Sequence, residues 1–556
     1  MQVLAYNLDT LSRLLAEQGG RSETYIRSKS HTEYFRCYFE HLGAKTIVVE
    51  SEYVDRDYLE DYAAYYSRCH YEYPRKCTRL HFFSEGFSEQ QWLGFLSDDN
   101  GPLTQEVLQK HYLGFIVLKP LPETVIGCTC LRVYDDTPER SFPILREYHA
   151  HLWGVFLKVR SLAFQEQDHV VAACATSALW AALQGTGTLF QHGIPSPIEI
   201  TRSAARHMPG RSRILPNKEG LTIEQMAHAI RDVGLEPLAI GVENEFTLKT
   251  SLYAYLKARI PVLLIGRLCV IPGAGPARGD STQADTVRVA EGGGNGSAES
   301  ENGGQAAEYG SHSVVITGYR LGSEDLAINL VTPYACQACN INKIYAHDDA
   351  VGPFARMRFD GTVVSGPPDE GDLFSLSTSY HPGDFQGEMR FVPKTLLVPL
   401  YHKIRIPFDT IREVVTDFQI VVSAAVTTGR VDAENLLWDV YLTTVNDYKQ
   451  EVRRNNRLSA GARIEILRRS LPRFLWRAKA TCRDGVLIDL LLDATDIEQG
   501  YCFVRPMQVD PRLADFLASF TNRCESQWGD RPSWTIVRQF KSGGVPPMPS
   551  GDDYVI

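Results

Sequence analysis

The sequence predicts a chain of several domains in the α+β class. Its 556 residues correspond to about three or four domains at a typical length of about 150 residues. Hydrophobic residues make up 44% of the chain and charged residues 22%, which is enough apolar material to bury real cores. Segments with apolar residues at helical spacing are interspersed with β-branched runs that are typical of strands, and three regions can be distinguished.

Residues 1–160 are expected to form a first domain of mixed helices and strands. LDTLSRLLAEQ and VDRDYLEDYAAYYSRC carry apolar and aromatic residues at helical spacing. AKTIVVES predicts a strand, and YLGFIVLKPLP predicts a buried strand that ends at its prolines. The many tyrosines and phenylalanines of this region indicate an aromatic core.

Residues 161–362 are expected to form a second domain, which begins with a helix from about Ala172 to Gln184. A further helix is predicted at TIEQMAHAIRDVG, because Thr222 and Gln225 have the spacing of a capping box and Gly234 ends the run. SLYAYLKARI predicts a helix. Strands are predicted at PVLLIGRL, SHSVVITGYRL, LAINLVTP and within INKIYAHDDAVGPFARMRF.

Residues 273–310 interrupt this second domain with a segment rich in Gly, Ala, Ser and acidic residues. Such a composition cannot bury enough apolar surface to order itself, so we expect a mobile insertion. A loop of this length often borders a functional site. It is equally compatible with a surface insertion that the fold tolerates.

Residues 363–556 are expected to form a third domain of α/β type, whose first part, VVSGPPDEGDLFSLSTSYHPGDFQGE, is expected to be a turn-rich linker. The region contains no internal repeat and no motif with a mechanism attached to it. Its acidic residues Asp489, Asp493 and Asp496 suggest a metal site only weakly, because the same pattern is more typical of a strand end and a solvated turn.

Charge and targeting features limit the expected partners. The net charge of −10 and the pI near 5.9 argue against a nucleic-acid partner. The first twenty residues lack the pattern of a signal peptide, and no apolar run is long enough for a membrane span. We therefore expect a cytoplasmic protein without membrane contact, whose twelve cysteines are reduced thiols.

The stretch DHVVAACATSALWAALQ places Cys174 near the first turn of the predicted Ala-rich helix. Unpaired N–H groups and the helix dipole favour a thiolate at that position, as a cysteine nucleophile requires. Free cysteine is also among the most frequently buried residues, so a structural thiol in a core helix is the alternative.

A partner set for this thiol lies farther along the chain. His312 opens the predicted strand HSVVITGYRL, directly after the insertion, and Asp348 and Asp349 follow a later short strand. A carboxylate in that place can hold the second imidazole nitrogen and fix its tautomer. Gln167, seven residues before Cys174, offers a side-chain N–H for an oxyanion. Taken singly, His312 is typical of a strand edge and the aspartates are typical of a turn.

The order of Gln167, Cys174, His312 within HSVVITGY, and Asp348 resembles that of the papain-like cysteine peptidases, and more closely their bacteriocin-leader-peptidase-like (C39-like) branch. The resemblance covers roughly residues 160–360 and implies a cysteine-bearing helix packed on an antiparallel sheet. Ala175 departs from the glycine that usually follows the cysteine in this family. Asp349 competes with Asp348, and Gln165 and Asp168 lie near Gln167, so these assignments stay open.

The resemblance implies a cysteine peptidase that hydrolyses a peptide or isopeptide bond without a cofactor or metal. A peptide or protein is then the substrate, and the flanking domains present it or hold a partner protein. One alternative is a catalytically inactive papain-like module that binds peptides. The other is a zinc-structured interaction protein, whose candidate ligands are Cys336 and Cys339 of a C-x-x-C motif, with His347, Cys69, His70, Cys77, Cys128 and Cys130. We favour reduced thiols in a loop over zinc for Cys336 and Cys339.

Overall fold

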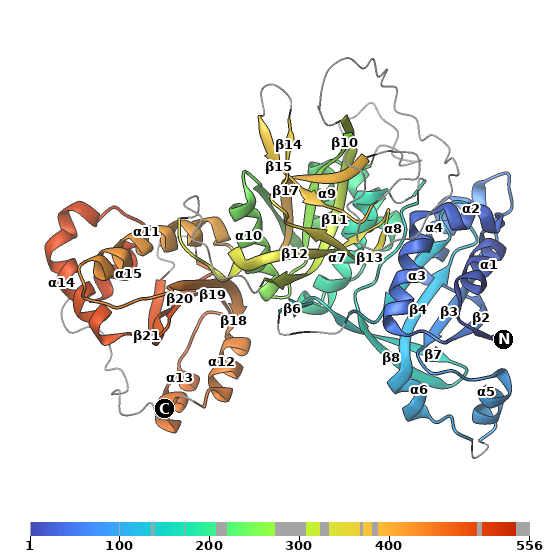
Figure 1. The fold of residues 1–556 in the computed structure, drawn as a ribbon, viewed down its shortest axis with the longest axis horizontal. Coiled ribbons are helices and arrows are strands. Elements are labelled where there is room, and N and C mark those ends of the chain that lie inside the picture. The colour runs from blue at the N-terminus through green and yellow to red at the C-terminus, as the bar shows by residue number, and fades with distance from the viewer. Residues whose placement is uncertain are drawn as a thin grey trace. The chain divides into compact units, whose positions relative to one another are not determined.

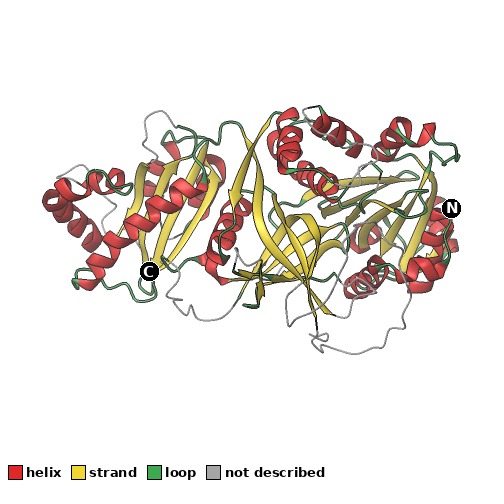
Figure 2. Cartoon of the chain, turned by 90° about the horizontal axis from the view of Figure 1, so that it is seen from above, coloured by secondary structure: helices red, strands yellow, loops and turns green. Residues whose placement is uncertain are grey.

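A computed structural model describes residues 2–540 except 99–100, 135–136, 138, 169, 172, 207–219, 273–306, 323–332, 367–370, 381–386, 457 and 497–502. The chain divides into two compact units. The first comprises Met1–Val242, Ile260–Arg320 and Asn342–Pro399, and the second comprises Glu243–Arg259, Leu321–Ile341 and Leu400–Ile556. Helices and strands occur in both, which confirms the α+β class (Figure 2). Among the described helices, none is long and apolar enough to cross a membrane.

The N-terminal part of the first unit is built on an antiparallel sheet with the strand order β1-β2-β3-β4-β5. Phe39 from a covering helix stacks on Phe82 of the sheet, with ring centroids 4.1 Å apart, so the expected aromatic core is present. The strands are β1 (Gln2–Ala5), β2 (Thr46–Tyr53), β3 (Cys77–Phe83), β4 (Tyr112–Leu118) and β5 (Ile126–Leu131). The helices are α1 (Leu8–Gly19), α2 (Glu23–Ser28), α3 (Ser30–Leu42), α4 (Arg56–Ala64), α5 (Glu89–Leu96) and α6 (Gln105–His111) (Figure 1).

A second sheet of the same unit carries the candidate site. Its path runs β10-β11-β12-β13-β16-β17-β9, and β10 also pairs with β17, so the strands from β10 to β17 close into a ring of pairings. The strands are β9 (Leu235–Gly241), β10 (Val262–Pro272), β11 (Ala307–Leu321), β12 (Ile341–Asp348), β13 (Gly352–Arg358), β16 (Leu376–Ser377) and β17 (Gly387–Tyr401). The short strand β6 (Arg140–Ser141) pairs with β11.

Three helices belong to this part of the chain: α7 (Cys174–Phe190), α8 (Pro197–Ala205) and α9 (Ile223–Asp232). Every residue of α7 from Ala175 to Thr186 is buried, and most of them are apolar. The predicted capping box is present at α9, because Thr222 Oγ1 accepts from Gln225 N and Gln225 Oε1 accepts from Thr222 N. The sequence thus located α7 and α9 within two residues at their N-termini.

The predicted regions differ from the compact units in their limits. The positions 160 and 362 both fall inside the first unit, which also holds the hairpins β7 (Arg146–Leu152) with β8 (Val155–Ser161) and β14 (Val363–Ser365) with β15 (Asp372–Phe374). The predicted insertion 273–310 lies outside the described residues except for 307–310, which begin β11 by pairing with β10. The predicted strand LAINLVTP lies outside them except for its final proline.

The second unit contains an antiparallel sheet with the order β18-β19-β20-β21. Its strands are β18 (Leu437–Thr444), β19 (Phe474–Cys482), β20 (Gly485–Asp493) and β21 (Phe503–Val509). Its helices are α10 (Glu245–Lys257), α11 (Phe408–Thr427), α12 (Val445–Arg454), α13 (Ala460–Arg468), α14 (Pro511–Trp528) and α15 (Trp534–Val537). Two buried tryptophans, Trp438 and Trp476, fill the core against this sheet.

Candidate active site

Cys174 is the first residue of α7, where the sequence placed it. Ala173 before it is extended, with φ −67° and ψ 175°, and Ser177 N bonds back to Ala173 O at 3.0 Å. The first N–H groups of a helix have no partner within the helix, so the backbone around Cys174 presents a positive end of the dipole. The thiol is free and half-buried rather than enclosed in the core. The thiol at this helix start is therefore partly accessible to solvent.

His312 lies on β11 and pairs with Gly266 of β10. A Cβ on Gly266 would come within 2.2 Å of Val392 O and 2.6 Å of the Phe391 ring, so only glycine permits this close approach of β17. The Phe391 ring in turn lies edge-on to the His312 ring, with centroids 6.4 Å apart. The imidazole is buried, at 6% exposure, and its orientation is set by its strand and by these neighbours.

The structure distinguishes between the two candidate aspartates. His312 Nε2 lies 2.9 Å from Asp348 Oδ1, which is hydrogen-bonding distance, and 3.9 Å from Asp349 Oδ1. Asp348 ends β12, and its Oδ1 also accepts from Ala350 N at 3.0 Å. Asp348 is therefore the carboxylate that orients His312, and Asp349 lies beside the pair without bonding to the imidazole.

Burial and charge separate the protonation states of this cluster. Burial alone would lower the pKa of His312, but the charge of Asp348 and its hydrogen bond outweigh burial and raise the pKa well above its usual value. Burial alone would raise the pKa of Asp348, yet His312 lowers it. Burial raises the pKa of Asp349 to about 7, opposed by His312 and assisted by the charge of Asp348. The site thus favours an imidazolium–carboxylate pair next to a second carboxyl group that binds its proton more tightly.

The Cys174 thiol completes the set. It lies near enough to His312 to raise the pKa of the imidazole, although the charge of Asp348 and its hydrogen bond have the larger raising effects. Because Nε2 faces Asp348, Nδ1 is the ring nitrogen that remains available for a proton transfer. Cys174, His312 and Asp348 come from a helix start, a strand and a strand end that are far apart in the sequence, and the fold brings all three together. This is the geometry that nucleophile, base and orienting carboxylate require.

The turn after Asp348 is held by a helix from the N-terminal part of the chain. From α3, Ser30 Oγ donates to Ala350 O at 2.6 Å, and His31 Nε2 lies 2.8 Å from Asp349 O. Tyr34 OH donates to Pro353 O at 2.5 Å, and its ring occupies the space that a side chain on Gly352 would need. No sequence pattern indicates this support, because residues more than 300 positions apart share no local signal.

The loop before α7 holds the candidate oxyanion donor. Gln167 is half-buried there, whereas Gln165 is buried at 6% exposure. Asp168 accepts from Tyr66 OH and from Val170 N, the latter at 2.9 Å, so it serves the structure of the loop. Glu166, which lies between the two glutamines in the sequence, pairs with Lys29, and its carboxylate accepts a hydrogen bond from Ile126 N at 3.1 Å. Of the two glutamines, Gln167 is the more accessible, and its oxyanion role stays a prediction.

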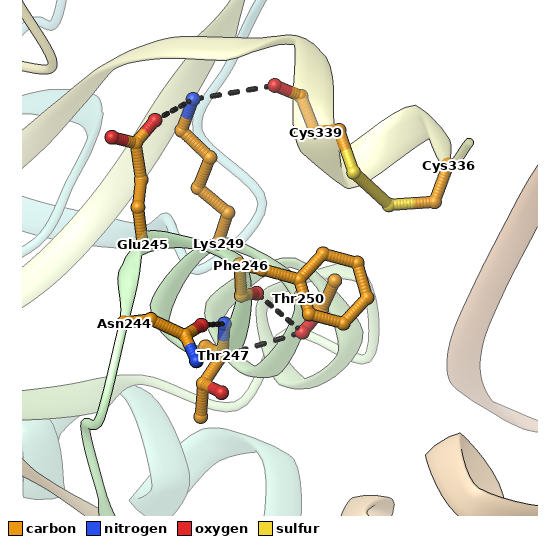
Figure 3. The surroundings of a disulfide bond; sticks show 8 residues. All are labelled: Asn244, Glu245, Phe246, Thr247, Lys249, Thr250, Cys336 and Cys339. Atoms are coloured by element: carbon orange, nitrogen blue, oxygen red, sulfur yellow. Dashed lines mark hydrogen bonds and ion pairs between the residues drawn. A yellow bond between two sulfur atoms is a disulfide. The ribbon is translucent and has the colours of Figure 1, made fainter. Parts of the chain in front are cut away.

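The cysteines proposed as zinc ligands are arranged differently from the prediction. Cys336 and Cys339 form a disulfide in the second unit, so the expectation of reduced thiols at this C-x-x-C is wrong (Figure 3). Lys249 lies beside it and donates to Cys339 O at 3.2 Å and to Glu245 Oε1 at 2.7 Å. His347 is buried elsewhere, with Nε2 3.0 Å from Leu162 O and Nδ1 accepting from Phe354 N. Neither the disulfide nor this histidine offers a free metal ligand.

Two further places with acidic side chains could be considered as metal sites. Asp489 accepts hydrogen bonds from Arg477 Nε at 2.9 Å and from Arg477 Nη2 at 2.8 Å, so this member of the predicted acidic cluster is paired. His312 and Asp348 of the candidate site, together with the neighbouring Asp349, bring their ligand atoms within 4.8 Å of one another, close enough to share an ion. The hydrogen bond between His312 and Asp348 already accounts for this closeness.

Comparison with known proteins adds no assignment: no protein-family model matches this chain, and no curated protein matches it. Its function is therefore inferred from the geometry of Cys174, His312 and Asp348.

Proposed function

We propose that this protein is a cysteine peptidase of the papain-like, C39-like kind, which hydrolyses a peptide or isopeptide bond in a peptide or protein substrate. The observation that carries the proposal is the hydrogen bond of the buried His312 to Asp348 at 2.9 Å, with the Cys174 thiol near enough to raise the pKa of the imidazole as well. A histidine that served only packing would not need both a buried carboxylate and a helix-borne thiol among its neighbours. The largely antiparallel sheet whose strand β10 contacts α7 is compatible with the fold that the resemblance implies.

The reaction uses the groups of this chain alone. The Cys174 sulfur, its proton held by His312, attacks the carbonyl carbon, and an S–C bond forms. The oxyanion lies against the Cys174 backbone N–H and the Gln167 side chain. The C–N bond then breaks as His312 gives its proton to the leaving amine. Water next attacks the thioester, His312 takes the water proton, and the S–C bond breaks to release the carboxylate and regenerate the thiol.

Asp348 acts by holding the imidazole. Its hydrogen bond to Nε2 leaves Nδ1 available for a proton transfer, and its negative charge stabilises the imidazolium that forms in each half of the reaction. Asp348 is therefore a positioning residue, whereas Cys174 and His312 are the catalytic residues. No cofactor enters any of these steps.

Site-selective alkylation tests the proposal. Iodoacetamide labelling of the native protein is followed by peptide mass spectrometry across pH 5 to 9, in wild type and in His312→Ala. We expect Cys174 to be alkylated faster than the other accessible cysteines, including the exposed Cys37. In His312→Ala we expect the alkylation rate of Cys174 to fall to that of the other cysteines. Cys37, which is exposed on α3, is the internal control. Labelling of Cys174 no faster than Cys37 would contradict the proposal.

The second candidate is a peptide-binding module of the same fold that does not turn over substrate. Ala175, buried next to the thiol, favours it, because the resembled family usually has a glycine at this position. A turnover assay separates the two functions. An unbiased peptide library is incubated with wild type and with Cys174→Ala, and cleavage products are read by mass spectrometry. Products that appear only with wild type support the peptidase. Peptides retained intact by both proteins, with fast labelling of Cys174 absent, support the binding module.

A further inference from the structure

Three buried polar atoms next to the candidate site have no hydrogen-bond partner in the protein. They are Gln165 Nε2, Ser177 Oγ and Asp349 Oδ2. Their side chains are buried, at 6%, 4% and 4% exposure. A buried polar atom without a partner costs free energy, and native proteins leave few of them, so three in one place need a common explanation.

All three side chains line the same cavity. Its volume is about 10 Å³, and the other lining residues are Phe164, Ala178, Ala181 and His347. Both ring nitrogens of His347 are already bonded, to Leu162 O and Phe354 N, so the polar atoms that remain come from Gln165, Ser177 and Asp349. A volume of this size has room for about one water molecule, and a buried water makes about three hydrogen bonds.

We propose that Gln165, Ser177 and Asp349 bind a single ordered water molecule, and that this water positions the Asp349 carboxyl group beside His312. The water accepts from Gln165 Nε2–H, donates to Asp349 Oδ2, and bonds the Ser177 hydroxyl. Each of the three atoms then has its partner, and the water has the number of bonds typical of a buried site. The hydration site itself does not depend on catalysis, whereas its positioning role rests on the proposed function.

The water would hold the carboxyl group of Asp349, which forms no hydrogen bond with the His312 imidazole. Asp349 Oδ1 lies 3.9 Å from His312 Nε2, too far for a hydrogen bond, and Asp349 O is held by His31 at 2.8 Å. The backbone of Asp349 is thus anchored from one side and its carboxyl group from the other. Asp349 is in this scheme a positioning residue, which sets the charge that His312 and Asp348 experience.

A matched pair of serine substitutions tests the hydration site by stability. Ser12 on α1 is also a buried helical serine whose hydroxyl has no partner, and it does not line the cavity. Removing such an orphan hydroxyl is neutral or stabilising, so Ser12→Ala should leave Tm unchanged or raised. Ser177→Ala removes a partner of the water and should lower Tm by about 2 °C or more relative to Ser12→Ala. Equal effects of the two substitutions would overturn the proposal.

Crystallography of the full chain gives the direct measurement. One density peak within hydrogen-bonding distance of Gln165 Nε2, Ser177 Oγ and Asp349 Oδ2 is expected, and it should vanish or shift in Ser177→Ala. An unfilled cavity, or a direct bond between the Gln165 and Asp349 side chains, would overturn the proposal.

The positioning role is read from the nitrogen resonances of the His312 imidazole. Gln165→Met, which keeps the length of the side chain and removes its N–H, should shift the midpoint of their titration, while Ser12→Ala should not. An unshifted midpoint overturns the positioning role. If the peak is present but alkylation of Cys174 is independent of His312, the peptidase proposal fails and the water site stands.

Discussion

The imidazole Nε2 of His31 lies 2.8 Å from the backbone carbonyl oxygen of Asp349, 318 residues farther along the chain. The neighbouring Ser30 and Tyr34 bond to Ala350 O and Pro353 O of the same segment. The N-terminal helix α3 therefore fixes the turn that carries the carboxylate partner of His312. A part of the chain that the sequence left without a role is in this way a structural component of the candidate site.

Loss of the His31 contact should disturb both stability and the site. Burial lowers the pKa of His31, so at neutral pH the ring is uncharged and its Nε2–H donates to Asp349 O. We expect His31→Ala to cost about 1 to 3 kcal/mol of unfolding free energy and to slow alkylation of Cys174. His41→Ala, an exposed histidine at the end of the same helix, is the control for urea denaturation and labelling. Equal behaviour of the two variants would show that the α3 contact does not hold the turn.

The two aspartates should differ in their effect on His312. Asp348 bonds Nε2, whereas Asp349 lies 3.9 Å away. We expect Asp348→Asn to lower the pKa of His312 by about one unit or more, equivalent to about 1.4 kcal/mol, and Asp349→Asn to change it less. Nitrogen chemical shifts of the imidazole, followed through a pH titration, measure both. A larger change in Asp349→Asn would reverse the assignment of the partner.

The buried neutral histidines predict a loss of stability in acid. Burial lowers the pKa of His347 to about 3 and that of His81 to about 4. Below pH about 6.5 the unfolded chain binds protons at these rings and the folded chain does not, so unfolding becomes easier as pH falls. For His347 the loss amounts to about 3 kcal/mol at pH 4. Urea midpoints from pH 7 to 4 measure it, and His347→Gln should flatten the curve.

The contribution of the His312–Asp348 pair to folding stability has the opposite pH dependence: it is lost as pH rises. The raised pKa of His312 means that its contribution is complete below pH about 6.5 and is lost as pH rises through the folded-state pKa. The lowered pKa of Asp348 keeps the carboxylate charged down to acid pH. The difference in stability between wild type and Asp348→Asn should therefore be largest near pH 5 to 6 and shrink in alkali. A difference that grew with pH would contradict the ion pair.

The disulfide between Cys336 and Cys339 can be tested by counting alkylated thiols before and after reduction. Alkylation of the denatured, unreduced chain should leave Cys336 and Cys339 unmodified, and the peptide that contains them should gain two labels after reduction. Closing so short a loop stabilises a fold by about 2 kcal/mol in the chain-entropy estimate, so Cys336→Ser with Cys339→Ser should have a modest effect on unfolding. Labelling of both cysteines without reductant would show that the bond is not formed.

Local patterns determined much of the fold in advance. The helical spacing that begins near Cys174, the Thr222 capping box of α9, and the β-branched run that became β11 are signals carried by a few neighbouring residues. Such signals act through backbone capping and side-chain periodicity, and these are fixed within a few turns of chain. The order of thiol, imidazole and carboxylate along the chain could also be predicted, because the order of residues in a motif does not depend on how the chain packs.

Other features depended on tertiary contacts that no local pattern encodes. The choice of Asp348 over Asp349 follows from which carboxylate the bulge at the end of β12 turns toward His312. The hold of α3 on residues 349–353 follows from packing across the first unit. The sequence by itself thus determined which residues are available for chemistry and the elements that carry them. Tertiary structure alone decided their partners, because distance, burial and charge depend on segments hundreds of residues apart.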